Sequence, residues 1–248
     1  MLKVDSRLVS VTGHRGNAGF APENTMISFE EALDLGVDAL ETDVRLSSDG
    51  VPFLFHDASL ERITGTRGPA DSLTIAELRA LDAGSWKGPE FRDQGIPELV
   101  ELAELCRDRA RLVLDLKVEG AAGPIAEALR VTGLPRDAVS ICAWNDRHAR
   151  DVQTHLEGVD LRFSTEKPLP RCDESWFEQL KDRGYHGLSI QWKFATEELI
   201  RLAHAHQVQV VTWTVNEPAE MNWALSSGVD EIITDDPAGL IAAHANPS

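Results

Sequence analysis

Two carboxylates and an imidazole that could act together lie in one short segment, residues 39–57. Glu41 and Asp43 are two positions apart in an apolar run typical of a β-strand, and an Asp-Gly pair separates this run from His56. Alternate residues of a strand face the same side, so the two carboxylates project together. The Asp-Gly pair favours a hairpin that returns His56 to a place roughly opposite Asp43. Because two buried anions need a neutralising cation, the segment predicts a divalent metal site.

Four more side chains with suitable chemistry stand at or near the ends of other strand-like runs. His14 and Arg15 follow the run 8–12, and Asp115 and Lys117 share one face of the run 111–117. Taken singly, each has a structural explanation, such as a hydrogen-bonded histidine or a plain ion pair. A structural ion pair does not need two histidines, three carboxylates and two cations converging on one place. The combination therefore favours an active site.

Strand-like and helix-like segments alternate along the chain and would position these side chains. The expected strands are 8–12, the run from 39 to the Asp-Gly pair, 111–117, 138–143, 161–164, 187–190, 208–215 and 231–234. The expected helices are 25–35, a segment around 99–105, 125–132, 146–155, 174–183, 196–206 and 218–227. Eight strands separated by helices in 248 residues predict a (β/α)8 TIM barrel, whose chemistry gathers at the carboxyl ends of its strands. A doubly wound open sheet is the alternative.

The segment 58–97, which follows the hairpin, interrupts this alternation. It is polar, contains several glycines and prolines, and has helical spacing only around 75–81. A stretch of this length without regular structure is unusual inside a compact domain and is more often a functional cap or lid. We therefore expect one TIM-barrel domain, residues 1–248, with 58–97 as an insertion or cap.

Composition excludes several classes of partner. The chain has 24 Lys and Arg residues against 41 Asp and Glu residues, a net charge of −17, which argues against binding to nucleic acid or to an anionic membrane surface. Any phosphate-binding site must then carry its own local positive charge. The three cysteines include no CxxC pair, a pattern that favours reduced thiols and a cytoplasmic location. No apolar window approaches a membrane-spanning length, so we expect no integral membrane association.

An ordered set of short motifs resembles the glycerophosphodiester phosphodiesterases, a family of the PI-phospholipase-C-like phosphodiesterase superfamily. The motifs are HRG at 14–16, PENT at 22–25, ETDV at 41–44, DG at 49–50, HD at 56–57, LDLK at 114–117, WTVN at 213–216 and GVDEIITDDP at 228–237. They cover essentially the whole chain, and the segment after His56 looks like the insertion that marks this family. The resemblance implies an enzyme that hydrolyses a small-molecule glycerophosphodiester to sn-glycerol 3-phosphate and an alcohol.

The resemblance also implies a role for each candidate residue. One divalent cation, Mg²⁺ or Ca²⁺, would be bound by Glu41, Asp43 and Asp115, although the family usually has a glutamate where this chain has Asp115. By the same resemblance, His14 and His56 would be the general acid and base, Arg15 and Lys117 would pair with phosphate oxygens, and Trp213 would form an apolar wall for the substrate.

Several neighbouring residues have two interpretations. Glu23 and Asn24 contact the substrate, or Asn24 caps the helix 25–35. Asp57 orients His56 or caps a turn, whereas packing is the favoured interpretation for Trp144 and Trp192. The Asn145-Asp146 and Asp235-Asp236 pairs fit solvated loops or helix starts.

At the level of function, the alternatives are a lysophospholipase D or another phosphodiesterase of the same superfamily, and a non-catalytic barrel that binds phosphodiesters. An apolar rim on 58–97 would favour the lysophospholipase D, but this segment is mostly polar.

Overall fold

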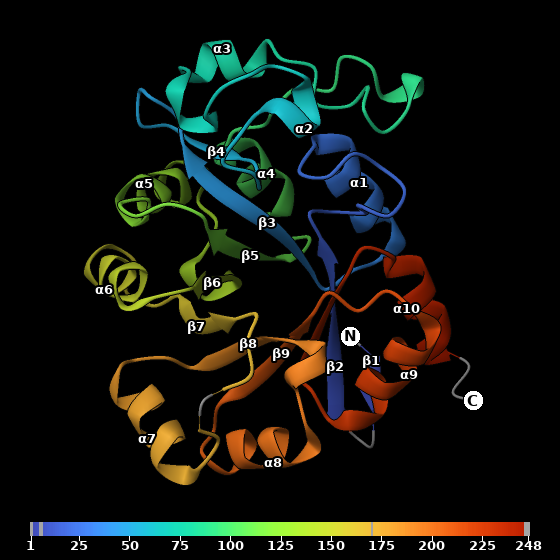
Figure 1. The fold of residues 1–248 in the computed structure, drawn as a ribbon, viewed down its shortest axis with the longest axis vertical. Coiled ribbons are helices and arrows are strands. Elements are labelled where there is room, and N and C mark those ends of the chain that lie inside the picture. The colour runs from blue at the N-terminus through green and yellow to red at the C-terminus, as the bar shows by residue number, and fades with distance from the viewer. Residues whose placement is uncertain (1, 5–6, 170, 246–248) are drawn as a thin grey trace.

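Eight parallel strands form a closed ring at the centre of the molecule (Figure 1). The computed structural model describes residues 2–4, 7–169 and 171–245. The ring consists of β2 (Arg7–His14), β3 (Ala39–Leu46), β5 (Arg111–Leu116), β6 (Val139–Ala143), β7 (Asp160–Thr165), β8 (Gly187–Gln191), β9 (Gln209–Trp213) and β10 (Glu231–Thr234). Each predicted strand corresponds to one of these, with its ends shifted by a few residues.

The ring is closed by β2, the first strand of the barrel, which pairs in parallel both with β3, the next strand, and with β10, the last strand. It pairs with β10 through Val11 and Ile232, and with β3 through Thr12 and Ala39. The eight parallel strands therefore leave no unpaired edge between them. A doubly wound open sheet would leave an unpaired edge strand at each end. The predicted TIM barrel is confirmed, and the open sheet is excluded.

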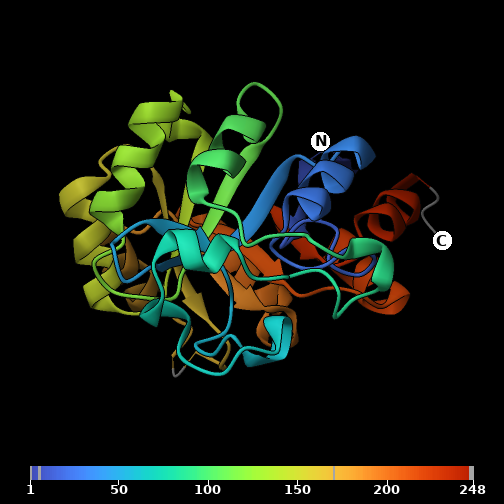
Figure 2. The ribbon, with the colours of Figure 1, turned by 90° about the horizontal axis from the view of Figure 1, so that it is seen from above.

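Helices surround the ring and shield the outer faces of its strands, as Figures 1 and 2 show. They are α1 (Met26–Leu35), α4 (Leu99–Cys106), α5 (Ala122–Thr132), α6 (Asp146–His155), α7 (Glu174–Asp182), α8 (Glu197–Ala205), α9 (Pro218–Ser227) and α10 (Pro237–Ala245). Only α10 was not expected from the sequence. Because both faces of the ring are covered, most of its strand residues are buried, polar ones included, and all five residues of β6 are buried.

Local sequence sets the ends of these helices. In α8 the Thr196 side chain accepts a hydrogen bond from the Leu199 amide at the start, and the helix buries Leu199, Ile200 and Ala203 toward the barrel. The α1 helix ends at Gly36, whose φ of 90° is a left-handed conformation that glycine adopts without steric cost. No helix among the described residues is long and apolar enough to cross a membrane.

Two short strands lie outside the ring. The strand β4 (Pro52–Leu54) pairs antiparallel with β3, and Gly50 allows the turn between them with a φ of 81°. The predicted hairpin is therefore present, and it carries His56 just beyond its second strand. The other, β1 (Leu2–Val4), pairs antiparallel with β2 and was not predicted.

The segment 58–97 contains more structure than its weak periodicity suggested. It includes α2 (Glu61–Thr64), α3 (Ile75–Arg79) and 3-10 turns at Ala70–Ser72 and Pro89–Phe91; the predicted helix 75–81 is thus shorter than expected. Its buried apolar side chains join Phe53 and Phe55 of the hairpin in a cluster separate from the main core. In Figure 1 the segment lies at the top, beside β4 and α1. It packs on the same hairpin that carries His56.

Candidate active site

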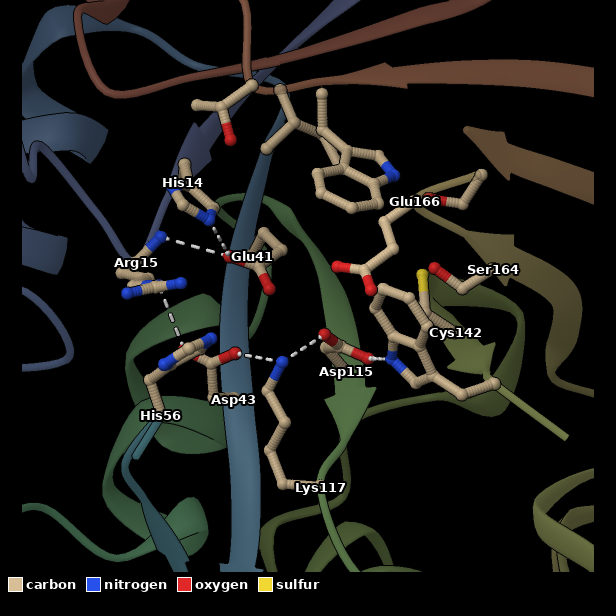
Figure 3. Close-up of a pocket in the computed structure, with 15 residues that line it drawn as sticks. His14, Arg15, Glu41, Asp43, His56, Asp115, Lys117, Cys142, Ser164 and Glu166 are labelled. Atoms are coloured by element: carbon tan, nitrogen blue, oxygen red, sulfur yellow. Dashed lines mark hydrogen bonds and ion pairs between the residues drawn. The ribbon is translucent and has the colours of Figure 1, made fainter. Parts of the chain in front are cut away.

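A cavity of about 190 Å³ opens at the carboxyl ends of the barrel strands and is lined by the side chains drawn in Figure 3. All eight predicted site residues line it: His14, Arg15, Glu41, Asp43, His56, Asp115, Lys117 and Trp213. The remaining lining residues include Cys142, Trp144, Ser164, Glu166 and Ser189. The barrel thus brings together side chains that are up to 199 positions apart in sequence, from His14 to Trp213.

The three carboxylates form one buried cluster. Glu41 and Asp43 share a face of β3, and the β3–β5 register makes Asp115 the direct neighbour of Asp43. One oxygen from each of the three side chains lies within 4.8 Å of the others. The exposed fractions of Glu41, Asp43 and Asp115 are only 5%, 1% and 8%. Such confinement of three acids is costly without compensating positive charge.

The pKa values of the carboxyl groups reflect this crowding. Burial, and then the neighbouring Asp43, raises the pKa of Glu41 to about 7. Burial also raises the pKa of Asp115, although the Lys117 ammonium opposes the shift. The pKa of Asp43 lies below its ordinary value, because the attraction of Arg15 and Lys117 outweighs the effect of burial. Asp43 is therefore the firmly ionised member, whereas Glu41 lacks sufficient cationic compensation.

Two cations reach this cluster from opposite sides. The Lys117 Nζ atom lies 3.0 Å from Asp43 Oδ1 and 2.6 Å from Asp115 Oδ2, and so bridges β3 and the end of β5. The Arg15 Nε atom lies 3.0 Å from Asp43 Oδ2, and its Nη1 donates to Glu23 Oε1 at 2.7 Å. Both cations border the cavity, where a phosphate group could replace part of these contacts.

Each histidine has one ring nitrogen engaged by an aspartate. His14 Nδ1 lies 2.6 Å from Asp235 Oδ1, and His56 Nδ1 lies 2.7 Å from Asp57 Oδ1. Burial lowers the pKa of His14, but Glu41 and Asp235 outweigh it and leave the pKa above its ordinary value. An aspartate on Nδ1 leaves Nε2 as the nitrogen that can exchange a proton with a ligand. Of the two interpretations of Asp57, orienting His56 or capping a turn, this contact supports the first.

The donor set of this cluster fits a hard divalent cation. Carboxylate oxygens are the ligands that Mg²⁺ and Ca²⁺ prefer, and three of them converge here beside the cations of Arg15 and Lys117. The raised pKa of Glu41 identifies the carboxylate that would gain most from an ion. The three acids predicted as ligands therefore have the proximity that a metal site requires.

We expect Glu41→Gln to stabilise the chelator-treated protein at pH 8. A carboxyl whose pKa is raised on folding loses stabilisation as the pH rises from its ordinary value of 4.5 through about 7. The glutamine variant has no such loss, so its free energy of unfolding should exceed that of the wild type by about 3 kcal/mol at pH 8 and by little at pH 4. Urea denaturation at both pH values measures this, with the exposed Glu127→Gln as control. An equal difference at pH 4 and pH 8 would contradict the explanation.

Two tryptophans, Trp144 and Trp213, form an aromatic part of the cavity wall. Trp213 ends β9, and its ring meets that of Trp144 edge to face at a centroid distance of 5.8 Å. The Trp144 Nε1 atom donates a hydrogen bond to Asp115, and Lys117 Nζ lies 5.6 Å from the Trp144 ring centroid. Trp144 therefore lines the site, contrary to the favoured packing interpretation. Trp192 does pack against the core, as predicted.

Asn24 does not cap the first helix, and this prediction was wrong. The N-cap of α1 is Thr25, and it makes no side-chain capping bond. The buried Asn24 side chain instead donates to Asp43 Oδ2 at 2.9 Å and accepts from Thr42 Oγ1 at 2.7 Å. Its φ of 56° is left-handed, a conformation that asparagine tolerates better than most residues. Asn24 therefore supports β3 from the loop that follows β2.

We expect Asn24→Gly to lower the free energy of unfolding by about 1 to 3 kcal/mol, because it leaves the buried Thr42 hydroxyl without its acceptor and removes one hydrogen bond from the Asp43 carboxylate. Glycine accepts the left-handed backbone, so the loss reports the side-chain hydrogen bonds alone. The matched control is Asp93→Gly, at an exposed residue whose φ is 68°. Chemical denaturation of both variants measures the difference, and equal stabilities would contradict this role for Asn24.

Two further polar residues make contacts in the site that the sequence does not predict. Asp235, expected in a solvated loop or at a helix start, contacts His14 and also accepts a hydrogen bond from Asn216 Nδ2 at 2.6 Å. Its place immediately after β10, at the carboxyl end of a barrel strand, was the available signal. Arg62 of α2 contacts both Asp57 and Glu23, and nothing in the local sequence pattern indicated this.

Comparison with known proteins identifies the family. A family model described as the glycerophosphoryl diester phosphodiesterase family matches residues 14–239. This chain belongs to that family. The match confirms the resemblance carried by the short motifs and the prediction of an enzyme of the glycerophosphodiester phosphodiesterase class.

Individual members of the family agree along nearly their whole length. A glycerophosphodiester phosphodiesterase of Caldanaerobacter subterraneus subsp. tengcongensis is 32% identical over 238 residues, which cover 93% of this chain and 96% of the relative. One of Bacillus altitudinis is 29% identical, with the same two coverages of 93% and 96%. Among solved structures, this chain is similar to an Oleispira antarctica phosphodiesterase in complex with the product sn-glycerol-3-phosphate. The two sequences are 30% identical, and the two folds superpose with a TM-score of 0.89 over 96% of this chain and 98% of that one.

Proposed function

We propose that this chain hydrolyses glycerophosphodiesters to sn-glycerol 3-phosphate and an alcohol in a metal-dependent reaction. The observation that carries the proposal is the convergence of two histidines, three carboxylates and two cations on one cavity at the carboxyl end of the barrel. Membership of the glycerophosphodiester phosphodiesterase family supports the reaction class. The product bound by the Oleispira antarctica relative supports the glycerol phosphate half of the substrate.

In this proposal, the substrate phosphate lies between Arg15 and Lys117. Both side chains are anchored by acids behind them, so that they present positive charge to the cavity of an otherwise acidic protein. The planar guanidinium of Arg15 suits two phosphate oxygens at once, and the Lys117 ammonium acts as a point charge. Trp213 forms an apolar wall for the organic part of the substrate.

Glu41, Asp43 and Asp115 would hold one Mg²⁺ or Ca²⁺. Such an ion supplies positive charge that polarises the phosphoryl group and stabilises the charge that develops on it. Asp115 is already oriented by Trp144 and Lys117, which bind its two oxygens. These contacts fix the orientation of an aspartate side chain that is one methylene shorter than the glutamate the family usually has.

The two histidines perform the proton transfers. One accepts a proton at Nε2 from the attacking hydroxyl, and the other donates a proton from Nε2 to the oxygen of the departing alcohol. Attack by water gives sn-glycerol 3-phosphate directly. Attack by the neighbouring glycerol hydroxyl gives a cyclic phosphodiester, which water then opens with the two histidines in exchanged roles. Asp235 and Asp57 hold the Nδ1 atoms of His14 and His56, so the ring orientations are set before the substrate binds. This arrangement needs no other proton carrier.

We also propose that 58–97 is a cap within the one barrel domain of residues 1–248. The segment buries its leucine and isoleucine side chains in a cluster of its own rather than presenting them at the cavity. Apart from Trp86, which is 40% exposed, it therefore offers little apolar surface for a lipid chain, which disfavours the lysophospholipase D alternative.

A direct assay tests the proposed function. Glycerophosphocholine and glycerophosphoethanolamine are incubated with the metal-replete protein, with and without EDTA, and released glycerol phosphate is measured. We expect turnover that EDTA abolishes. Release of the headgroup alcohol from lysophospholipids alone, with lysophosphatidic acid as the other product, would favour the lysophospholipase D, and binding without turnover in the folded protein would favour the non-catalytic barrel.

A further inference from the structure

The guanidinium group of Arg62, in the segment 58–97, donates hydrogen bonds to two carboxylates beside the cavity, those of Asp57 and Glu23. Arg62 Nε donates to Asp57 Oδ2 at 2.6 Å, and Nη2 donates to Asp57 Oδ1 at 3.1 Å. The same side chain donates to Glu23, from Nη1 to Oε2 and from Nη2 to Oε1, at 2.8 Å each. Both contacts are bidentate, the geometry in which arginine binds carboxylates most specifically.

Each gripped carboxylate in turn holds a side chain of the site. Asp57 engages His56 Nδ1 at 2.7 Å, and Glu23 accepts from Arg15 Nη1 at 2.7 Å. Arg62 itself does not line the cavity. One residue outside the cavity therefore connects to a predicted proton carrier through Asp57 and to a predicted phosphate ligand through Glu23.

The rest of the segment keeps this guanidinium in place. Its Cζ lies 5.8 Å from the centroid of the Trp86 ring, and Lys87 Nζ lies 5.7 Å from the same ring. Lys87 also donates to the backbone oxygens of Ala18 and Gly19 at 2.7 and 3.0 Å, which ties the segment to the loop after β2. That loop carries Arg15 and Glu23, so both ends of the contact network have a fixed backbone.

Charge explains why the two carboxylates need Arg62. Glu23 and Asp57 both accept from its Nη2 atom and are therefore close to each other. Hydrogen bonds from Arg62 are the main cause that lowers the pKa of Asp57 to about 2, so Asp57 is ionised at neutral pH. Without the guanidinium, two adjacent anions would repel and turn away from each other. His56 and Arg15 would then lose the partners that orient them.

We propose that Arg62 is a positioning residue, which holds Asp57 and Glu23 together so that His56 and Arg15 keep their working orientations. The segment 58–97 thereby acts as a brace on the reaction site. The inference rests on the proposed function for the roles of His56 and Arg15. It assigns to the segment a task beyond covering the cavity.

The test compares Arg62→Ala and Arg62→Lys with Arg67→Ala, a control in the same segment whose side chain is 92% exposed. For Arg62→Ala we expect kcat to fall about tenfold to hundredfold, and KM to rise, because both His56 and Arg15 lose their orientation. Lysine cannot bind two carboxylates in a bidentate manner, so Arg62→Lys should recover only part of kcat. Millimolar guanidinium should restore part of the activity of Arg62→Ala, and Arg67→Ala should match the wild type.

A purely structural role would have a different signature. The Arg62 side chain is 45% exposed, so its ion pairs contribute little to folding, and the melting temperature of Arg62→Ala should stay near that of the wild type. In a background with Asp57→Asn and Glu23→Gln, adding Arg62→Ala should have almost no further effect on kcat. Wild-type kcat and KM in both Arg62 variants, or the full loss in that background, would overturn the proposal.

A spectroscopic readout separates this proposal from the proposed function. The ring nitrogen resonances of His56 should shift in Arg62→Ala and stay unchanged in Arg67→Ala, whether or not the protein turns over a glycerophosphodiester. If the resonances shift but the wild type has no turnover, the proposed function fails and the positioning contact stands. If the wild type is active and the resonances do not shift, the positioning role fails alone.

Discussion

Alanine in place of His14 or His56 is expected to lower kcat for glycerophosphodiester hydrolysis by about a hundredfold or more. Each variant lacks one of the two imidazoles that border the cavity, and no other histidine lines it. Each imidazole is held at Nδ1 by an aspartate, so a water molecule that replaces it would lack both the orientation and the pKa. KM should change less than kcat, because phosphate binding is assigned to Arg15 and Lys117.

Rates measured from pH 5 to pH 9 provide the strongest form of this experiment. The wild type should give a bell-shaped profile, and each variant should lose one limb of it. His186→Ala is a matched control, since this side chain is 66% exposed and lies just before β8, at the amino end of the barrel strand. Near wild-type turnover in both single variants would remove the histidines from the mechanism.

Removal of the divalent ion is expected to lower activity by about a hundredfold or more, and added Mg²⁺ or Ca²⁺ should restore it. The variant Asp43→Asn should resemble the chelated enzyme and should not recover with added metal. Asp43 is central to the site because it contacts Arg15 and Lys117 and is 1% exposed. Loss of its charge removes a proposed metal ligand and the carboxylate that the two cations share.

Calorimetric titration of each protein with Mg²⁺ and Ca²⁺ gives a readout that does not depend on turnover. We expect one site per chain in the wild type, none in Asp43→Asn, and a retained site in Asp115→Glu, which keeps the carboxylate and lengthens the side chain. Glu127→Gln, on the exposed side of α5, controls for general loss of negative charge. Full activity of a protein shown to be metal-free would refute metal dependence.

Local sequence patterns predict how Glu41, Asp43 and His56 are placed at the carboxyl end of the barrel. The two-residue periodicity of a strand places Glu41 and Asp43 on one face whatever the rest of the chain does, and the Asp-Gly turn sends His56 back toward them. The alternation of strands and helices predicts the barrel, and a barrel predicts that residues at strand ends converge. These inferences succeed because backbone geometry over a few residues determines them.

Sequence patterns mispredicted the roles of side chains that could bond to more than one partner. Asn24 has the sequence context of a helix cap, but Asp43 and Thr42 compete for its amide, and they are buried where an unpaired polar group is costly. Trp144 has the character of a packing residue, but its indole N–H needs an acceptor and finds Asp115. Local propensity cannot rank such partners, since they come from other strands.

Sequence by itself determined the eight-strand alternation and the identity of eight of the residues that line the cavity. Only the tertiary structure decided that Asp115 pairs in register with Asp43, that Asp235 holds His14 across 221 positions, and that Arg62 links Asp57 to Glu23. The physical reason is that closing the ring sets the strand register and brings distant loops together. Hydrogen bonds between those loops form only after the barrel has packed, so no local pattern in the chain encodes them.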